Sequence, residues 1–179
     1  MLQSSFSIVD QIMIGQLGSA GVLESAYLID DMTVEIIADG VHLPKPLLQF
    51  VYKFKGPKKT ALCTDAMRGA GMPDGDSILG SLKNGQRVII EDGVAKMPDR
   101  TAFAGSVATT DRLVRTMIEV AEVPLVDAVQ MMTQTPAEII GVADRKGSLE
   151  AGKDADIVIF DEGIQVHYTI SEGTIIYSK

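Results

Sequence analysis

A strand–helix–strand pattern across residues 34–65 constrains the fold of this chain more than any other feature of its sequence. Residues 34–38 and 60–63 are short apolar runs typical of buried strands. The residues between them have helical spacing that begins at two prolines and ends at Gly56-Pro57. A crossover of this kind is right-handed and makes the two strands parallel, so that their carboxyl ends lie at the same edge of the sheet. We therefore expect an α/β fold in which the segments that follow the two strands lie side by side.

Ionisable side chains follow both of these strands. The first strand is followed by Asp39-Gly40-Val41-His42, which contains one of the two histidines of the chain, and the second by Thr64-Asp65-Ala66-Met67. The carboxyl ends of parallel strands are where α/β barrels carry their catalytic groups. The local pattern is at least as consistent with simpler roles, namely a turn-capping carboxylate at Asp65 and a structural histidine at His42.

Two groups of short strands are predicted in the rest of the chain. Residues 87–91 and 94–96 flank Asp92-Gly93, a two-residue turn typical of a β-hairpin. Near the C-terminus, three β-rich runs are separated by acidic and glycine turns and predict a small sheet. These runs are residues 157–160, 166–170 and 174–177.

Helices are predicted between the two groups of strands. Helical spacing returns after Thr109, a second helix follows Pro124, and Thr135-Pro136-Ala137-Glu138 has the form of a capping box. These helices have the composition of packing elements, and their methionines are expected to fill gaps in a core. The predicted packing faces are Leu47, Leu48, Val51 and Phe54 in the helix before residue 56, and Leu113, Val114, Met117, Ile118 and Ala121 in the helix after Thr109.

Four motifs in a fixed order carry a family resemblance. The first motif is the pair of segments that end in His42 and Met67. It is followed by a glycine-rich segment at 68–75, by Phe103-Ala104-Gly105-Ser106, and by Lys-Gly-Ser-Leu-Glu-Ala-Gly-Lys-Asp-Ala-Asp at 146–156. Together they resemble the C-terminal half of the N-acetylglucosamine-6-phosphate deacetylase family, over residues 18–179. The last motif is shared by many metal-dependent amidohydrolases and is weakly diagnostic alone.

The resemblance implies a partial barrel. Residues 18–145 would be the last strands and helices of an amidohydrolase-type (β/α)8 barrel, and residues 146–179 would be a small C-terminal β-sheet, part of a β-sandwich. Residues 1–17 match nothing in the family. A complete barrel needs roughly 250 residues, whereas this chain has 179, so we expect the barrel to be incomplete.

The resemblance also implies an activity and a set of site residues. Family members hydrolyse the acetamide of N-acetylglucosamine 6-phosphate to give glucosamine 6-phosphate and acetate, and Asp65 matches the aspartate that takes a proton from water and returns it to the nitrogen. The residues that would contact substrate are Asp39, Gly40, Val41 and His42 in one loop, and Phe103, Ala104, Gly105 and Ser106 in a second. From the local pattern alone, the second loop is nearly as consistent with an ordinary turn.

A divalent metal, zinc or iron, is expected in the complete family enzyme. Its ligands are glutamate and histidine residues of the N-terminal half, and this chain has no counterpart for them, so it is expected to hold no metal. Two interpretations follow. The chain is either a deacetylase part that is inactive by itself, or a non-catalytic domain with an interaction role or none.

Composition and charge exclude some classes of binding partner for this chain. A net charge of −8, spread along the sequence, argues against nucleic acid and anionic membranes, and no apolar run reaches the ~18 residues of a membrane span. The single cysteine, Cys63, lies in a strand pattern and is expected to be a small packing residue, which fits a reducing cytoplasm. Unpaired strand edges in a partial barrel predict a homo-oligomer.

Overall fold

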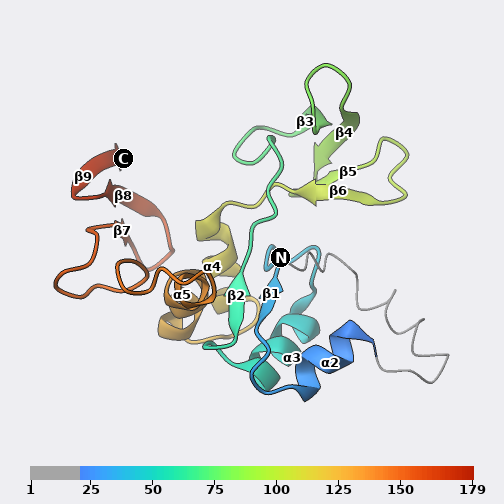
Figure 1. Ribbon diagram of the computed structural model, residues 1–179. Coiled ribbons are helices and arrows are strands. Elements are labelled where there is room, and N and C mark those ends of the chain that lie inside the picture. The colour runs from blue at the N-terminus through green and yellow to red at the C-terminus, as the bar shows by residue number, and fades with distance from the viewer. Residues whose placement is uncertain (1–20) are drawn as a thin grey trace.

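The computed structural model describes residues 21–179 (Figure 1), so the segment 1–17 that the sequence sets apart lies outside the described residues. The described chain begins with helix α2 (Val22–Leu28), strand β1 (Val34–Ile36), helix α3 (Lys45–Lys55) and strand β2 (Thr60–Leu62). Strands β1 and β2 pair in parallel, with Val34 opposite Thr60 and Ile36 opposite Leu62. The predicted strand–helix–strand unit is confirmed.

The buried face of α3 differs from the prediction at one position. Leu48 and Val51 are buried as expected, but Phe54 is 60% exposed. Lys55 is buried on this helix instead, and its ammonium donates to two backbone carbonyls at the end of α2, at 2.7 and 3.0 Å. Burial of the Lys55 ammonium is tolerated because it donates hydrogen bonds to carbonyls. A buried lysine does not contribute to an apolar periodicity, so its burial could not be predicted from the sequence pattern.

The main hydrophobic core lies between the parallel strands and three helices, α3, α4 (Thr110–Glu119) and α5 (Leu125–Met132). Its fully buried side chains include Leu48, Leu113, Met117 and Met131. The predicted stripe of α4 is therefore confirmed, and the two methionines act as core residues.

Helix α6 (Gln134–Ile139) corrects another prediction, because its N-cap is Thr133 rather than Thr135 and no side-chain hydrogen bond caps it. The hydroxyl of Thr135 donates instead to the carbonyl of Pro57 at 2.7 Å. The Thr135 hydroxyl, which the predicted capping box would use to cap the helix, is thus engaged in a hydrogen bond to a distant segment of the chain.

A four-stranded antiparallel sheet follows β2. It consists of β3 (Gly75–Leu79), β4 (Gln86–Glu91), β5 (Val94–Lys96) and β6 (Phe103–Ser106) in that order. The predicted β4–β5 hairpin is confirmed, with φ of 54° at Asp92 and 73° at Gly93, as the favoured two-residue turn requires. A parallel bridge between Ala66 and Ser106 joins β6 to the end of β2. The sheet consequently lies beyond the carboxyl end of β2 (Figure 1).

The C-terminal sheet consists of the three predicted strands, β7 (Ile157–Phe160), β8 (Val166–Ser171) and β9 (Thr174–Ser178), and their pairing is antiparallel. The motif at 146–156 fixes the chain before it. Lys146 forms ion pairs with Asp154 and Asp156. Gly147 has φ of 91° and packs so closely on α6 that an added Cβ would lie 2.8 Å from the Cβ of Ala137. This motif has a structural role in the described chain.

Candidate active site

A tight turn after β1 fixes the first predicted segment. Oδ1 of Asp39 accepts hydrogen bonds from the backbone N–H groups of Val41 (2.9 Å) and His42 (2.8 Å), and Oδ2 lies 2.8 Å from Nδ1 of His42. Asp39 is only 2% exposed. The bond at Nδ1 leaves Nε2 as the imidazole atom that can meet a ligand.

Asp39 is ionised in this turn. Burial acts to raise the pKa of its carboxyl, but hydrogen bonds from the ring and backbone of His42 and the backbone of Val41 outweigh burial and hold the pKa below its ordinary value. Because a carboxylate only accepts hydrogen bonds, Nδ1 carries the proton of the shared bond. When the ring is neutral, its Nε2 is therefore unprotonated and can accept a hydrogen bond.

The second predicted segment meets the first through an aromatic contact. The ring of Phe103, the first residue of β6, lies with its centroid 5.0 Å from that of His42, and the two planes are inclined by 53°. Phe103 is 49% exposed and the side chain of His42 is 20% exposed. This contact gives the candidate site an apolar surface beside a hydrogen-bonding nitrogen.

Residues 103–106 form strand β6 rather than the loop expected from the sequence. Ala104 and Ser106 are buried, and Oγ of Ser106 accepts a hydrogen bond from the N–H of Ala108 at 3.0 Å. Gly105 has φ of 102° and faces Met67. Phe103 is therefore the residue of this segment with the most exposed side chain.

Asp65 lies after β2 and its backbone is fixed by the other end of β6. Its carbonyl accepts from the N–H of Ser106 (3.3 Å), and the carbonyl of Ser106 accepts from the N–H of Met67 (2.9 Å). Asp65 has φ of 44°, a left-handed conformation that is uncommon for residues other than glycine and that clusters at functional sites. Asp65 is exposed.

Strand β6 brings the three predicted segments together. Phe103 at its start contacts His42, and Ser106 at its end pairs with the segment of Asp65. Three residues of extended chain span about 10 Å, which is the scale of a monosaccharide site. The structure thus places the His42–Phe103 pair at one end of β6 and the segment of Asp65 at the other, beyond the carboxyl ends of β1 and β2.

Arg112 is a residue near this site that the sequence analysis missed. Its Nη1 donates to the carbonyl of Gly93 and its Nη2 donates to the carbonyl of Asp39, both at 2.8 Å. Arg112 lies in the first turn of α4, where a cation faces the positive end of the helix dipole. That unfavourable position is a weak sequence signal of a partner outside the helix.

The described residues do not fit a metal ion. Within residues 21–179, no group of three or more His, Cys, Asp or Glu side chains could hold one, and Asp39 and His42 are bonded to each other. Cys63 is not an activated nucleophile, because burial and a hydrogen bond to Glu35 raise the pKa of its thiol to about 11. Its thiol is therefore protonated at neutral pH, in line with the expected packing role.

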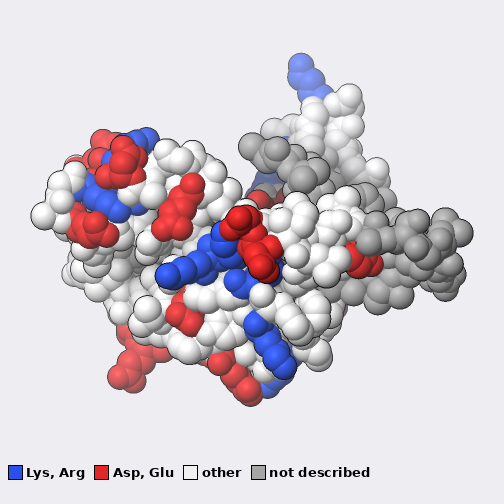
Figure 2. Space-filling model, turned by 60° about the horizontal axis from the view of Figure 1, so that its bottom comes forward, with Lys and Arg blue, Asp and Glu red and all other residues white. Residues whose placement is uncertain are grey.

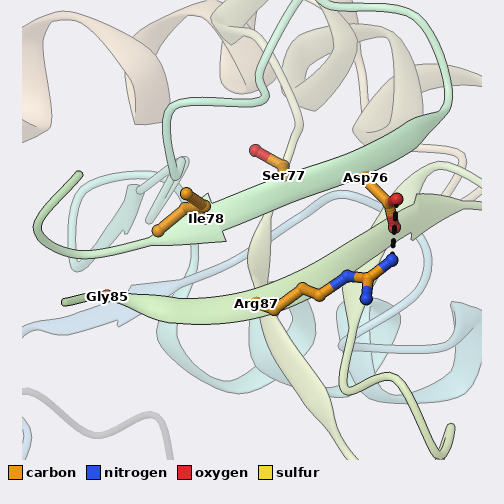
Figure 3. Close-up of a pocket in the computed structure, with 5 residues that line it drawn as sticks. All are labelled: Asp76, Ser77, Ile78, Gly85 and Arg87. Atoms are coloured by element: carbon orange, nitrogen blue, oxygen red, sulfur yellow. Dashed lines mark hydrogen bonds and ion pairs between the residues drawn. The ribbon is translucent and has the colours of Figure 1, made fainter. Parts of the chain in front are cut away.

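A hollow of about 350 Å³ on the β3–β4 hairpin lies apart from these segments (Figure 3). Its two charged lining residues, Asp76 and Arg87, pair with each other at 2.9 Å, and none of its lining residues belongs to the predicted site. Figure 2 shows basic side chains next to acidic ones over the face it presents, rather than a continuous basic surface. No helix within residues 21–179 is long and apolar enough to cross a membrane.

Comparisons with known proteins show which family the chain is similar to. The amidohydrolase family model matches residues 12–176. An N-acetylglucosamine-6-phosphate deacetylase of Lysinibacillus sphaericus is 36% identical over 155 residues, which are 87% of this chain and 38% of that protein. An N-acetylgalactosamine-6-phosphate deacetylase of Escherichia coli O157:H7 is 35% identical over 140 residues, which are 78% of this chain and 36% of that protein.

A solved structure of a deacetylase is also similar to this chain in its fold. The crystal structure of the Thermotoga maritima N-acetylglucosamine-6-phosphate deacetylase matches with a TM-score of 0.79 at 30% identity, and the match covers 89% of this chain and 42% of that chain. This chain accordingly spans less than half the length of these three relatives. All the predicted site residues lie within the matched range 12–176. The chain belongs to the amidohydrolase family, and the relatives that it is similar to include N-acetylglucosamine-6-phosphate deacetylases.

Proposed function

We propose that this chain supplies the proton-transferring and sugar-contacting side of an active site that hydrolyses the acetamide of N-acetylglucosamine 6-phosphate. The products are glucosamine 6-phosphate and acetate. The observation that carries the proposal is that strand β6 contacts both the His42 turn and the segment of Asp65, in a chain of the amidohydrolase family. The substrate is inferred from relatives of which the chain spans 38% and 42%.

Asp65 is proposed as the general base and acid. Amide hydrolysis needs a group that takes a proton from the attacking water and a group that gives one to the nitrogen as the C–N bond breaks. One carboxylate can do both in turn. The exposure of Asp65 and its left-handed backbone support this role, and a well-placed acid or base typically contributes about 10²–10⁴ in rate.

His42 is proposed to contact the sugar. Its Nε2 accepts a hydrogen bond when Nδ1 donates to Asp39, and a sugar hydroxyl or the acetamide N–H supplies the matching donor. Phe103 offers an apolar surface beside it. Asp39, Gly40 and Val41 make up the rest of the first proposed contacting segment, and Ala104, Gly105 and Ser106, which lie in β6, make up the rest of the second.

The identity of the amino sugar rests on two similar relatives. One acts on N-acetylglucosamine 6-phosphate and the other on N-acetylgalactosamine 6-phosphate, at 36% and 35% identity to this chain. Both sugars carry the same acetamide and phosphate. We favour the glucosamine derivative, because the matched structure is also an N-acetylglucosamine-6-phosphate deacetylase.

The rest of the proposal concerns the complete enzyme. We propose that residues 18–145 are the last part of a (β/α)8 barrel and that residues 146–179 belong to a small β-sandwich. Family enzymes use a divalent metal, zinc or iron, and the described residues do not provide its ligands. We therefore propose that the chain by itself is inactive, that it forms homo-oligomers through its strand edges, and that it acts in the cytoplasm without nucleic acid or membrane partners.

A non-catalytic domain is the alternative function. The observation that favours it is the lack of a metal-ligand group within residues 21–179. The two proposals differ in one respect, since only a deacetylase part can regain activity when the missing ligands are supplied from another chain.

The test is acetate release from both sugar phosphates. The purified chain is assayed with added zinc, iron or manganese, alone and after mixing with a separately produced N-terminal half of the Lysinibacillus sphaericus relative. We expect no acetate from the chain alone and acetate from the mixture. A mixture that assembles but releases none supports the non-catalytic alternative, whereas metal-stimulated turnover by the chain alone contradicts the proposed inactivity.

A further inference from the structure

Arg112 joins two segments that are distant in sequence and that both reach the proposed site. Its guanidinium donates to the carbonyl of Asp39 and to the carbonyl of Gly93, each at 2.8 Å. Asp39 begins the turn that carries His42. Gly93 lies in the β4–β5 turn, within the sheet whose strand β6 carries Phe103. Arg112 therefore joins the His42 turn to the sheet that also carries Phe103, at the residue before Val94, which pairs with Ser106 of β6.

The Arg112 guanidinium packs closely against Gly93, and helix α4 also packs closely against Gly40. An added Cβ at Gly93, where φ is 73°, would lie 3.0 Å from Nη2 of Arg112, so the guanidinium lies directly against this glycine. On the other side, Gly40 lies against Thr116, and an added Cβ there would be 3.3 Å from the Thr116 methyl. Helix α4 thus contacts the His42 turn at Arg112 and at Thr116, one turn apart.

The hydrogen bonds inside the His42 turn do not fix its position against the sheet. The Asp39 carboxylate accepts all three, from Val41 and His42, within four consecutive residues. They set the orientation of the ring within the turn. The distance from the ring to Phe103 depends instead on contacts that leave the turn, among which the Arg112 bond to the Asp39 carbonyl is charge-assisted.

We infer that Arg112 is a positioning residue, which sets the place of the His42 imidazole relative to Phe103 without touching the substrate. Its importance for catalysis rests on the proposed function, but its effect on the ring contact does not. Arginine suits this task because its planar fork donates in two fixed directions, whereas a lysine ammonium is a single point charge on a flexible stem.

The test is proton and nitrogen NMR of His42 in the full chain. His42 becomes the sole histidine when His167→Gln is introduced, since the chain has two. All spectra are recorded at about pH 8.5, where an ordinary imidazole is neutral. Phe103→Leu gives the chemical shifts of the His42 ring protons without the neighbouring aromatic ring.

Arg115→Gln is the matched control. Arg115 lies on the same helix and also donates to two backbone carbonyls, those of Gly163 (3.0 Å) and Ile164 (2.8 Å), but these belong to the connection between β7 and β8. Its loss removes the same kind of bond away from His42.

We expect Arg112→Gln to move the His42 ring-proton shifts at least half of the way to the Phe103→Leu values and to abolish the NOE between the two rings. The proton should stay on Nδ1, because the Asp39 bond is local. Arg112→Lys should behave like Arg112→Gln, and Arg115→Gln should leave the shifts unchanged.

Unchanged His42 shifts in a folded Arg112→Gln chain would overturn the inference, and so would an equal change in Arg115→Gln. If Arg112→Gln does not fold, as judged by the dispersion of its methyl resonances, Arg112→Lys decides by the same criteria. Parent-like His42 shifts in Arg112→Lys would show that a positive charge alone suffices, and would overturn the claim that the two fixed donor directions of the guanidinium are needed. None of these readouts requires turnover, so a failed acetate assay would contradict the proposed function and leave this inference standing.

Discussion

Replacement of Asp39 by asparagine should reverse the tautomer of His42. The asparagine carbonyl can still accept from the backbone N–H groups of Val41 and His42, as Oδ1 of Asp39 does. Its NH₂ group then occupies the position of Oδ2, 2.8 Å from Nδ1, and it can only donate. The proton must move from Nδ1 to Nε2, so the nitrogen that faces a ligand changes from an acceptor to a donor.

The cost in stability follows from the bond that is replaced. A hydrogen bond to a charged group contributes about 1.5–3 kcal/mol, whereas a neutral one contributes about 1 kcal/mol. Because the backbone bonds survive with a neutral acceptor, we expect Asp39→Asn to lower the free energy of unfolding by about 1–2 kcal/mol at pH 7. For a chain of this size, that corresponds to a decrease in Tm of about 5 °C.

The effect should depend on pH in one direction. Burial acts to raise the pKa of Asp39, but the hydrogen bonds from His42 and Val41 together lower it by more. The pKa in the folded chain is therefore below its ordinary value. A carboxyl with a depressed pKa stabilises the fold fully above its unfolded pKa of about 3.9, and this contribution is lost as the pH falls through the folded pKa. The difference between Asp39→Asn and the parent should therefore shrink below about pH 4.

Urea unfolding between pH 7 and pH 3 measures the stability difference, and nitrogen NMR of His42 reports the tautomer. Asp161→Asn is the control, because Asp161 pairs with the other histidine, His167, at 3.1 Å on the surface, where such pairs contribute about 0–1 kcal/mol. An Asp39→Asn chain that is as stable as the parent at pH 7, or that keeps its proton on Nδ1, would refute the reasoning.

Three further predictions test other parts of the structure. Gly147→Ala should lower the free energy of unfolding by about 1–3 kcal/mol, because Gly147 has a positive φ and lies in close contact with Ala137. The control Gly152→Ala, at φ 95° with open space around it, should lower the free energy of unfolding by less. Equal decreases for the two variants in urea unfolding would contradict the packing argument. Alkylation of Cys63 by iodoacetamide should accelerate with pH up to about 11, where its pKa lies; a plateau near pH 8.5 would contradict the raised pKa. The chain should be a dimer or larger by light scattering at micromolar concentration, and a strictly monomeric species would contradict the proposed association.

Local patterns were sufficient to predict the elements that place the site. The parallel pairing of β1 and β2 follows from two apolar runs and the handedness of the crossover, and the β4–β5 hairpin follows from Asp92-Gly93. The Asp39–His42 turn and the segment of Asp65 were predicted to lie at one edge because both follow parallel strands, and strand β6 contacts both segments.

Polar contacts between distant segments could not be predicted. Lys55, Thr135 and Arg112 each donate to carbonyls at least 19 residues away, and such bonds leave no periodicity in a sequence. Strand β6 was missed for a related reason, since its partner β5 is separated by a loop and its four residues include a glycine at φ 102°.

The measurement that tests the central claim most directly is turnover and substrate binding by Asp65→Asn in the mixture with the N-terminal half, compared with His42→Ala. The account predicts that Asp65→Asn loses at least about 10² in acetate release, while its Kd for N-acetylglucosamine 6-phosphate stays close to that of the parent. His42→Ala should instead weaken binding. Acetate release by Asp65→Asn at the parent rate would contradict the assignment of Asp65 as the proton-transferring group.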